Sequence, residues 1–433
     1  MSFSVASRYR LSDRVVRGAT FVLLLLCPLW AAMEATWPLL VGTCFVAGAG
    51  VVLLWHRDAL SMTTVLGGGV VLRLAFLPLL PGLTDDAFRY LWDGVLHWDG
   101  VNPYRYVPAD PALQRLHDTA LFERMNSPDY YSIYPPLSQL VFAAGALWYD
   151  VGGAGWLPAY YALKALLLGA ELAGLGLLAR MGEARTVLLY AWNPLVLLET
   201  AGQGHTEALV VPLLMLAVWA VRERRGGLAS VAVAAAGAVK LYPLLLGPLL
   251  LRRFGWRAVW PGALLGALLG APYAAAYVLP HVAASVDLFA RLFEFNAGPY
   301  YLAKHGLWLA TGSDWSKTLG PLFRGVFLAG LPVLYVMEAR WDWSFRRASL
   351  WGVGGLFVLS TTVHPWYLVP VVALAVLGER PNWPWLWLGL CSVGTYLFYV
   401  DGPYWAWIGL GWGGAALLAG GQAWRRDYSE ECP

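Results

Sequence analysis

Two adjacent carboxylates begin the most polar segment of an otherwise apolar chain. Asp85 and Asp86 open residues 84–108, and Arg89 follows one helical turn later. Keeping two like charges side by side next to a membrane is costly, which favours a chemical role for them. An ionised carboxylate can remove the proton of a hydroxyl group as a general base. We predict Asp85 as this base and Asp86 as the alternative. The structural explanation is that both acids only begin a helix and pair with Arg89.

Three basic side chains are candidates for binding a phosphate group. Lys240 lies well within an apolar segment, where an ammonium group usually has a functional partner. The alternative for Lys240 is that its side chain extends to the cytoplasmic interface. His364 stands at the outer end of an expected span and can donate a hydrogen bond to a phosphate oxygen. Arg89 is the third candidate.

Other polar and aromatic residues suit a sugar. His205 and Glu207 share one expected outer turn, where they contact sugar hydroxyls or orient an acceptor, or else only cap a helix. Tyr134 and Tyr367 can stack on sugar rings, although packing and an interfacial aromatic belt explain them about equally well. Asp85, Asp86, His205 and Glu207 carry possible metal ligands, but their spacing is not local. We therefore predict no metal ion and no cofactor.

The spacing from Asp85 to Trp98 predicts an amphipathic helix. Thr84 can cap its start, and the two acids suit the positive end of its dipole. The helix is rich in Trp and too short to cross a membrane, so we expect it to lie flat at the membrane surface with a solvated polar face. Its apolar face contains Phe88, Leu91, Trp92, Val95 and Leu96, and its polar face contains Asp86, Arg89, Asp93 and His97.

The composition is that of a polytopic membrane protein. Of 433 residues, 59% are hydrophobic and 13% are charged, and 24 Trp and 22 Tyr fit interfacial belts and an aromatic-lined site. No basic tract indicates a nucleic-acid partner. The four cysteines have neither zinc-ligand spacing nor the pattern of a disulfide framework. The membrane lipids themselves are the expected surroundings.

We predict an all-α bundle of about twelve crossings, with residues 1–433 forming one transmembrane domain. Residues 137–149 and 228–251 are expected to be half-helices, since full crossings would place arginine-rich turns outside. On this topology both termini are cytoplasmic, and residues 81–136 form an extracytoplasmic catalytic loop. The expected spans are roughly 19–36, 37–55, 63–80, 157–179, 186–200, 206–221, 258–279, 318–337, 348–363, 366–378, 384–399 and 404–421.

The residues beginning at Asp85 match a pattern found in a known superfamily. The pattern DDxxRYxWDGxxxxxGxNPY, which ends here at Tyr104, resembles the first outer loop of GT-C glycosyltransferases. The elements that follow in the superfamily's order are Tyr134-Pro135-Pro136-Leu137, Asn193-Pro194-Leu195, His205-x-Glu207 and Val239-Lys240-Leu241-Tyr242-Pro243. Over residues 80–370 the chain looks most like bacterial mannosyltransferases that use polyprenyl-phosphate-linked sugars.

The resemblance implies an enzyme of the cytoplasmic (inner) membrane. It would move a hexose, most often mannose, from a polyprenyl phosphate to a lipid-linked or other glycan hydroxyl at the outer face, with inversion. The alternative from another class is a transporter or flippase of lipid-linked sugars. A transporter more often has two related halves with interrupted helices at matching positions, and only one such interruption, at Lys240, is present.

Overall fold

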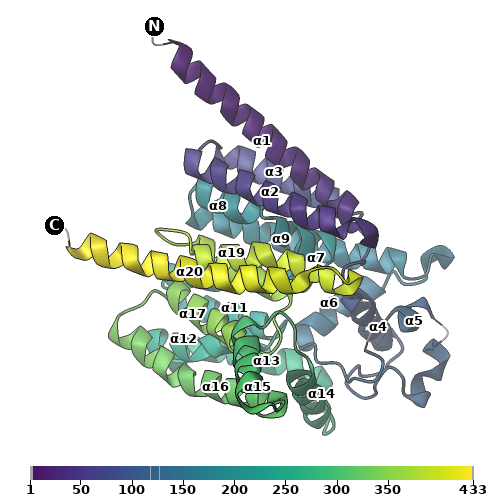
Figure 1. Cartoon of the computed structure of the whole chain (residues 1–433). Coiled ribbons are helices and arrows are strands. Elements are labelled where there is room, and N and C mark those ends of the chain that lie inside the picture. Colours follow the sequence, from purple (N-terminus) through teal and green to yellow (C-terminus); the bar gives the residue numbers. More distant parts are fainter. Residues whose placement is uncertain (1–2, 118, 126, 432–433) are drawn as a thin grey trace.

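The chain forms a bundle of helices in a computed structural model (Figure 1). The structure describes residues 3–117, 119–125 and 127–431. Within these ranges there is no β-strand, and an isolated β-bridge joins Phe295 to Thr362. The predicted all-α class with several apolar helices is confirmed.

The helices of the first half are α1 Phe3–Ala31, α2 Trp37–Arg57, α3 Met62–Phe76, α4 Asp86–Trp98, α5 Ala120–Arg124, α6 Pro136–Ala146, α7 Leu157–Met181, α8 Ala184–Ala191, α9 Pro194–Val196 and α10 Glu207–Arg222. Those of the second half are α11 Gly226–Gly237, α12 Gly247–Phe254, α13 Trp256–Gly270, α14 Val278–Leu292, α15 Gly298–Thr311, α16 Ser316–Arg340, α17 Phe345–Val358, α18 Val369–Val376, α19 Trp383–Ser392 and α20 Tyr404–Glu431. Short tight or wide turns join several of them, and four of these matter below: η4 Leu197–Gly202, η5 Tyr242–Leu246, η7 Pro365–Leu368 and η8 Val393–Val400.

Fewer helices than expected are long and apolar enough to cross a membrane alone. Among the described residues there are four, Ser12–Ala31, Glu34–Arg57, Leu157–Met181 and Ser316–Arg340, or up to six if two bent pairs each count as one span. The number of about twelve crossings is therefore not confirmed. Other expected spans are built from shorter pieces. In the span expected at 186–200, for example, Pro194 begins a new helix and cannot donate a backbone hydrogen bond.

The two apolar segments expected to be half-helices are indeed short. Residues 136–146 form the 11-residue α6, and residues 226–237 form the 12-residue α11. The second segment breaks after α11, and Lys240 lies in the break before the tight turn η5. Pro243 lies inside this turn and cannot donate a backbone hydrogen bond, which explains why α11 does not continue into α12.

The polar face of helix α4 is not solvated as expected. The helix packs against α5, α6 and α7, and both of its faces are largely buried. Gly94 makes this approach possible, because a Cβ atom there would collide with the backbone of Phe142 on α6. The expectation that Asp93 and His97 are solvated was wrong for Asp93, which is fully buried, and for His97, which is half-buried and bonded at both ring nitrogens. The polar face of α4 contacts other polar groups of the protein in place of water.

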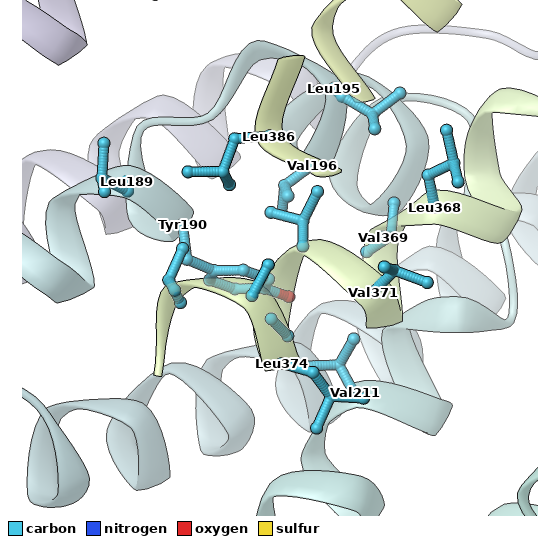
Figure 2. Close-up of a cluster of buried hydrophobic side chains, with 14 of the residues drawn as sticks. Leu189, Tyr190, Leu195, Val196, Val211, Leu368, Val369, Val371, Leu374 and Leu386 are labelled. Carbon is cyan, nitrogen blue, oxygen red and sulfur yellow. The ribbon is translucent and has the colours of Figure 1, made fainter. Parts of the chain in front are cut away.

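A continuous apolar core lies between the helices that lead to and from the site. Figure 2 shows part of it, with side chains from α8, α9, α10, η7, α18 and α19 in contact. Close packing holds helices together in a bilayer, where apolar surface gains little from leaving the lipid. The residues labelled there are Leu189, Tyr190, Leu195, Val196, Val211, Leu368, Val369, Val371, Leu374 and Leu386.

A buried ion pair fixes α3 to α7. Arg73 and Glu171 are both fully buried and form two hydrogen bonds, one of 2.6 Å between Nη2 and Oε1. Arg73 Nη1 also donates to the backbone oxygen of Ala191, 2.8 Å away on α8. An ionisable residue inside a membrane is a functional hypothesis by default. Here the partners satisfy each other, so we assign the pair to structure.

Candidate functional site

A wide helical turn followed by a sharp corner presents three polar side chains. Asn193 caps α9 by accepting the backbone N–H groups of residues 195 and 196, and the chain then enters the π-type turn η4. Helix α10 leaves at 116° to the preceding segment. Gly204 permits this corner with φ of 76°, a conformation that side chains disfavour. Turns of the π type are frequent at functional sites, and this one places Glu199, His205 and Glu207 together.

Two buried side chains tie this corner to the loop that carries the paired acids. The ammonium group of Lys164 donates to backbone oxygens at the end of α3 and at the end of η4, which are Leu77 (2.7 Å), Leu79 (2.8 Å) and Gly202 (2.7 Å). Gln203 Oε1 accepts the N–H groups of residues 82 and 83, at 3.2 and 3.1 Å. The start of α4 is therefore held next to the corner.

The element Tyr134–Leu137 binds directly to the break after α11. The N–H group of Leu137 donates to the oxygen of Ala238 over 2.8 Å, and Ser138 Oγ donates to that of Val239 over 2.9 Å. The first N–H groups of α6 thus satisfy carbonyls at the end of α11, where neither has a partner within its own helix. This contact brings Tyr134 and Lys240, far apart in sequence, to the same place.

The charged centre combines acidic and basic side chains from the start of α4, the corner and the break after α11. Lys240 forms an ion pair with Glu207, whose side chain is fully buried. His205 is also fully buried, with Nδ1 2.9 Å from Glu199 Oε2 and Nε2 3.9 Å from Asp86 Oδ2. The ammonium group of Lys240 therefore has a charged partner within this cluster.

Aromatic rings connect the charged centre to His364. Trp366 stacks on His205 at 4.1 Å and on His364 at 4.3 Å between ring centroids. The ammonium group of Lys240 lies 5.0 Å from the ring centroid of Tyr367, within the range of a cation–π interaction. Segment 364–367 therefore packs against the charged residues and forms part of the site.

Tyr134 contacts the charged cluster through the ring of Tyr90. The ring of Tyr90 lies 5.0 Å from that of Tyr134, and its hydroxyl donates to Asp86 over 3.3 Å. The structure thus connects seven of the nine residues predicted from sequence: Asp86, Tyr134, His205, Glu207, Lys240, His364 and Tyr367. Asp85 precedes Asp86 directly and is half-buried.

Several polar atoms of the cluster are buried without a hydrogen-bond partner in the described protein. They include Glu207 Oε2, His364 Nδ1 and both ring nitrogens of His205, whose close carboxylates are poorly aligned for hydrogen bonds. Such atoms are rare in proteins because an unpaired buried polar group is costly. Their concentration here indicates a site that binds polar ligand groups.

The environment of the paired acids suits proton transfer. Asp85 is the N-cap residue of α4, and desolvation together with the charge of Asp86 raises its pKa to about 6. Burial also raises the pKa of Asp86, although nearby Lys240, Tyr90 and Arg89 oppose this shift. A carboxyl group with a pKa near the working pH is a more effective base than an ordinary exposed one. Thr84 was expected to cap α4, but it precedes the cap residue Asp85, and its hydroxyl accepts the N–H group of Asp86 at 3.3 Å.

Arg89 points away from this cluster. Its Nε donates to Asp93 over 3.0 Å, and its Nη1 donates to the backbone oxygens of Ser127 and Tyr130, both at 3.0 Å. Asp93 in turn accepts hydrogen bonds from Ser132 and Gln139. These contacts give Arg89 a positioning role between α4 and the loop that leads to Tyr134.

Four residues of the candidate site were not predicted from the sequence: Glu199, Tyr396, Tyr90 and Trp366. Glu199 is fully buried, and the hydroxyl of Tyr396 donates to its carboxylate, with the two carboxylate oxygens 2.8 and 2.9 Å away. Tyr90 lies within the pattern that begins at Asp85, and Trp366 lies between His364 and Tyr367, but neither was predicted as a site residue. Glu199 lies in an expected span, where an acid is uncommon. That rule would have identified it.

A pocket of about 260 Å³ lies beside this cluster. Phe295 forms part of its wall and stacks on His364 with ring centroids 4.9 Å apart. Its other walls include the rings of Tyr301 and Trp405 and the ion pair between Glu294 and Lys304, whose charged atoms lie 2.6 Å apart. Aromatic walls with a few fixed polar groups are typical of small-molecule sites.

The described residues contain no group of three or more His, Cys, Asp and Glu side chains with the geometry to hold a metal ion. In this cluster the ammonium group of Lys240 lies against Glu207 and near the other acids. A metal-independent reaction stays a prediction for experiment.

Comparison with known proteins places the chain in a family. The family model described as alpha-(1->6)-mannopyranosyltransferase, N-terminal domain, matches residues 10–254, which is more than half of the 433-residue chain. Among curated proteins and solved structures there is no significant match. The matched region contains the paired acids, the corner of η4 and Lys240, whereas His364 and Tyr367 lie outside it. The chain therefore belongs to the alpha-(1->6)-mannopyranosyltransferase family and is a glycosyltransferase of the mannosyl-transferring class.

Proposed function

We propose that this enzyme moves mannose from a polyprenyl phosphate to a hydroxyl group of a lipid or glycan acceptor, with inversion at the sugar carbon. One observation carries the proposal: a connected cluster combines a carboxylate pair with an ammonium group and two imidazoles. Single-displacement transfer needs a base and a phosphate-stabilising cation on opposite sides of one sugar.

Asp85 is the base in this proposal. Its carboxylate takes the proton of the acceptor hydroxyl as the oxygen attacks the anomeric carbon. The bond from that carbon to the phosphate oxygen breaks, and its electron pair leaves with the polyprenyl phosphate. Asp86 supports the base by holding Tyr90 and lying close to His205. The alternative assignment exchanges the two acids and is tested in the Discussion.

Lys240 and His364 receive the phosphate in this proposal. The ammonium group lies between Glu207 and Tyr367, so it can share its charge with a phosphate oxygen without leaving its partner. His364 can donate from Nδ1, which has no hydrogen-bond partner within the described protein. A second donor is needed because the leaving phosphate gains negative charge during the transfer.

The remaining residues of the cluster contact the sugar and the acceptor. Glu207 Oε2 and His205 can bind sugar hydroxyls, and Tyr134 and Tyr367 offer ring faces to the pyranose. The pocket behind Phe295 is the proposed entrance for the acceptor hydroxyl. Since the contributing residues run from Asp85 to Tyr396, we propose that residues 1–433 act as one domain, with 81–136 as its catalytic loop.

A transfer assay tests the proposal. Purified enzyme with decaprenyl phosphate mannose and a mannoside acceptor is expected to release decaprenyl phosphate and to form a new mannosidic bond, with the α configuration when the donor is β. Excess chelator is expected to leave the rate unchanged. Movement of the intact lipid across liposomes without transfer would instead support a transporter.

We further propose that the site faces the outside of the cytoplasmic membrane. The start of α1 and the end of α20 lie on one side of the bundle, and α4 and α5 lie on the other (Figure 1). Arginine-rich N-terminal residues favour the inside for that first side.

Cysteine labelling tests this orientation in intact cells. After replacement of the native cysteines, an impermeant maleimide is expected to label Asp129→Cys, which lies on the exposed part of the loop. Ser429→Cys is expected to be labelled only after the membrane is permeabilised. The reverse pattern would overturn the orientation and with it the outer-face acceptor.

A further inference from the structure

A groove of about 340 Å³ lies between α11, α12, α13 and the start of α6. These helices are packed together in the structure (Figure 1). Its wall is almost entirely apolar and is built from glycine, alanine, proline, valine and leucine residues with one serine. Among the residues that line it are Ala234, Gly237, Ala238, Gly247, Ala263 and Gly266.

Packing explains why the groove is open in one place and closed in another. At Gly262, α13 touches α11 so closely that a Cβ atom would collide with the backbone of Ser230. At Gly247 and Gly266 a Cβ atom would meet nothing within 4 Å. The one hydroxyl in the wall, that of Ser230, donates to Gly227 and accepts from the backbone of Gly262. The wall therefore offers no unpaired polar group to a ligand.

One end of the groove reaches the catalytic cluster. Ala238 and Leu241, which stand on either side of Lys240, are lining residues, and so are Pro135 and Pro136, which follow Tyr134. A ligand that places a phosphate at the Lys240 ammonium can thus continue into the groove as an apolar chain. A branched, unsaturated hydrocarbon fits a wall without polar groups, whereas a sugar or a peptide would leave its polar groups unpaired.

We propose that this groove binds the prenyl chain of the donor and that Lys240 binds the phosphate at its end. The inference rests on the proposed function for the identity of the donor. It adds the direction in which the lipid leaves the site, along α11 and α13, and a surface that recognises the isoprenoid units next to the phosphate.

Filling the groove tests the proposal. Gly247→Phe and Gly266→Phe place a ring where the backbone leaves space, and the full-length enzyme is assayed with decaprenyl phosphate mannose. The KM for this donor is expected to rise by roughly tenfold, which corresponds to about 1.4 kcal/mol of lost binding free energy. Gly176→Phe is the matched control, because Gly176 is exposed on α7 and a Cβ atom there also meets nothing within 4 Å. Its KM is expected to equal that of the wild type.

A second measurement does not depend on the variants. A photoreactive prenyl phosphate is expected to crosslink to residues of α11, α12 or α13, and unlabelled decaprenyl phosphate is expected to compete whereas a diacyl phospholipid is not. Equal competition by the phospholipid, or wild-type KM in both filled variants, would reduce the groove to a contact with bulk lipid. If the wild type transfers no mannose but this crosslink persists, the proposed transfer fails and the prenyl-binding groove stands.

Discussion

Asp85→Asn is expected to lower mannosyl transfer by about 10²–10⁴-fold, the range for a missing general base, with donor binding nearly unchanged. Asparagine has the size of aspartate but does not accept the proton of the acceptor hydroxyl. The half-buried position at the start of α4 gives the replacement room without disturbing the core. Single-turnover rates with saturating donor and acceptor measure the loss.

Asp86→Asn separates the two acids. If Asp86 only supports the base, this variant keeps more activity than Asp85→Asn, because the hydrogen bond from Tyr90 can still go to an amide oxygen. A larger loss in Asp86→Asn than in Asp85→Asn would exchange their roles. Wild-type rates in both variants would show that the acidic pair is not catalytic.

The pH profile provides an independent check on the same residue. With a pKa of about 6, Asp85 is ionised at neutral pH and becomes protonated as the pH falls through that value. The expected kcat/KM is therefore constant above about pH 7 and decreases toward acid. Because the charge of Asp86 contributes to the raised pKa, Asp86→Asn is expected to move this decrease to lower pH. An unchanged profile would contradict the coupling between the acids.

Lys240→Met is expected to reduce transfer by about 10²–10³-fold, comparable with the loss of one donor to a charge that forms in the transition state. Methionine keeps most of the apolar stem but removes the ammonium group next to the departing phosphate. The substitution also leaves Glu207 buried without its partner, which by itself destabilises a protein by about 3–5 kcal/mol.

A double variant separates these two effects. Lys240→Met combined with Glu207→Gln removes both charges, so it is expected to recover thermal stability but not the phosphate interaction. Lys240→Arg keeps the charge and is expected to be only partly active, because a guanidinium group has a different shape from an ammonium group. Full activity in Lys240→Met would limit Lys240 to a structural ion pair, and thermal unfolding curves for all three variants supply the comparison.

Local features of the sequence were sufficient to predict the helical class and to select most residues of the candidate site. The spacing of apolar residues in α4 depends only on neighbours along the chain, and its helix was predicted within one residue of its observed start. The adjacent acids, the buried lysine and the polar corner stood out because charge is rare in apolar segments. The resemblance to GT-C enzymes then assigned these residues to one predicted glycosyltransferase site.

The number of crossings could not be read from apolar length alone. The residues expected to span at 186–200 form α8, α9 and the turn η4, with Asn193 capping the middle of the segment. An interruption of this kind becomes stable when tertiary contacts satisfy the freed backbone groups. Lys164 does so for η4 by binding the oxygen of Gly202, from a helix 38 residues earlier in the chain.

The surroundings of the polar helix faces also could not be predicted from the sequence. A hydrophilic face next to an apolar stripe normally contacts water, and on that basis Asp93 was expected to be solvated. In the structure Arg89, Ser132 and Gln139 surround Asp93, so the carboxylate holds the loop in place. The sequence alone identified which residues carry charge, and only the tertiary structure decided which of them meet. Some of these contacts, such as Asp86 with His205 and Glu199 with Tyr396, join residues more than a hundred positions apart, and no local pattern specifies the partner of a buried charge.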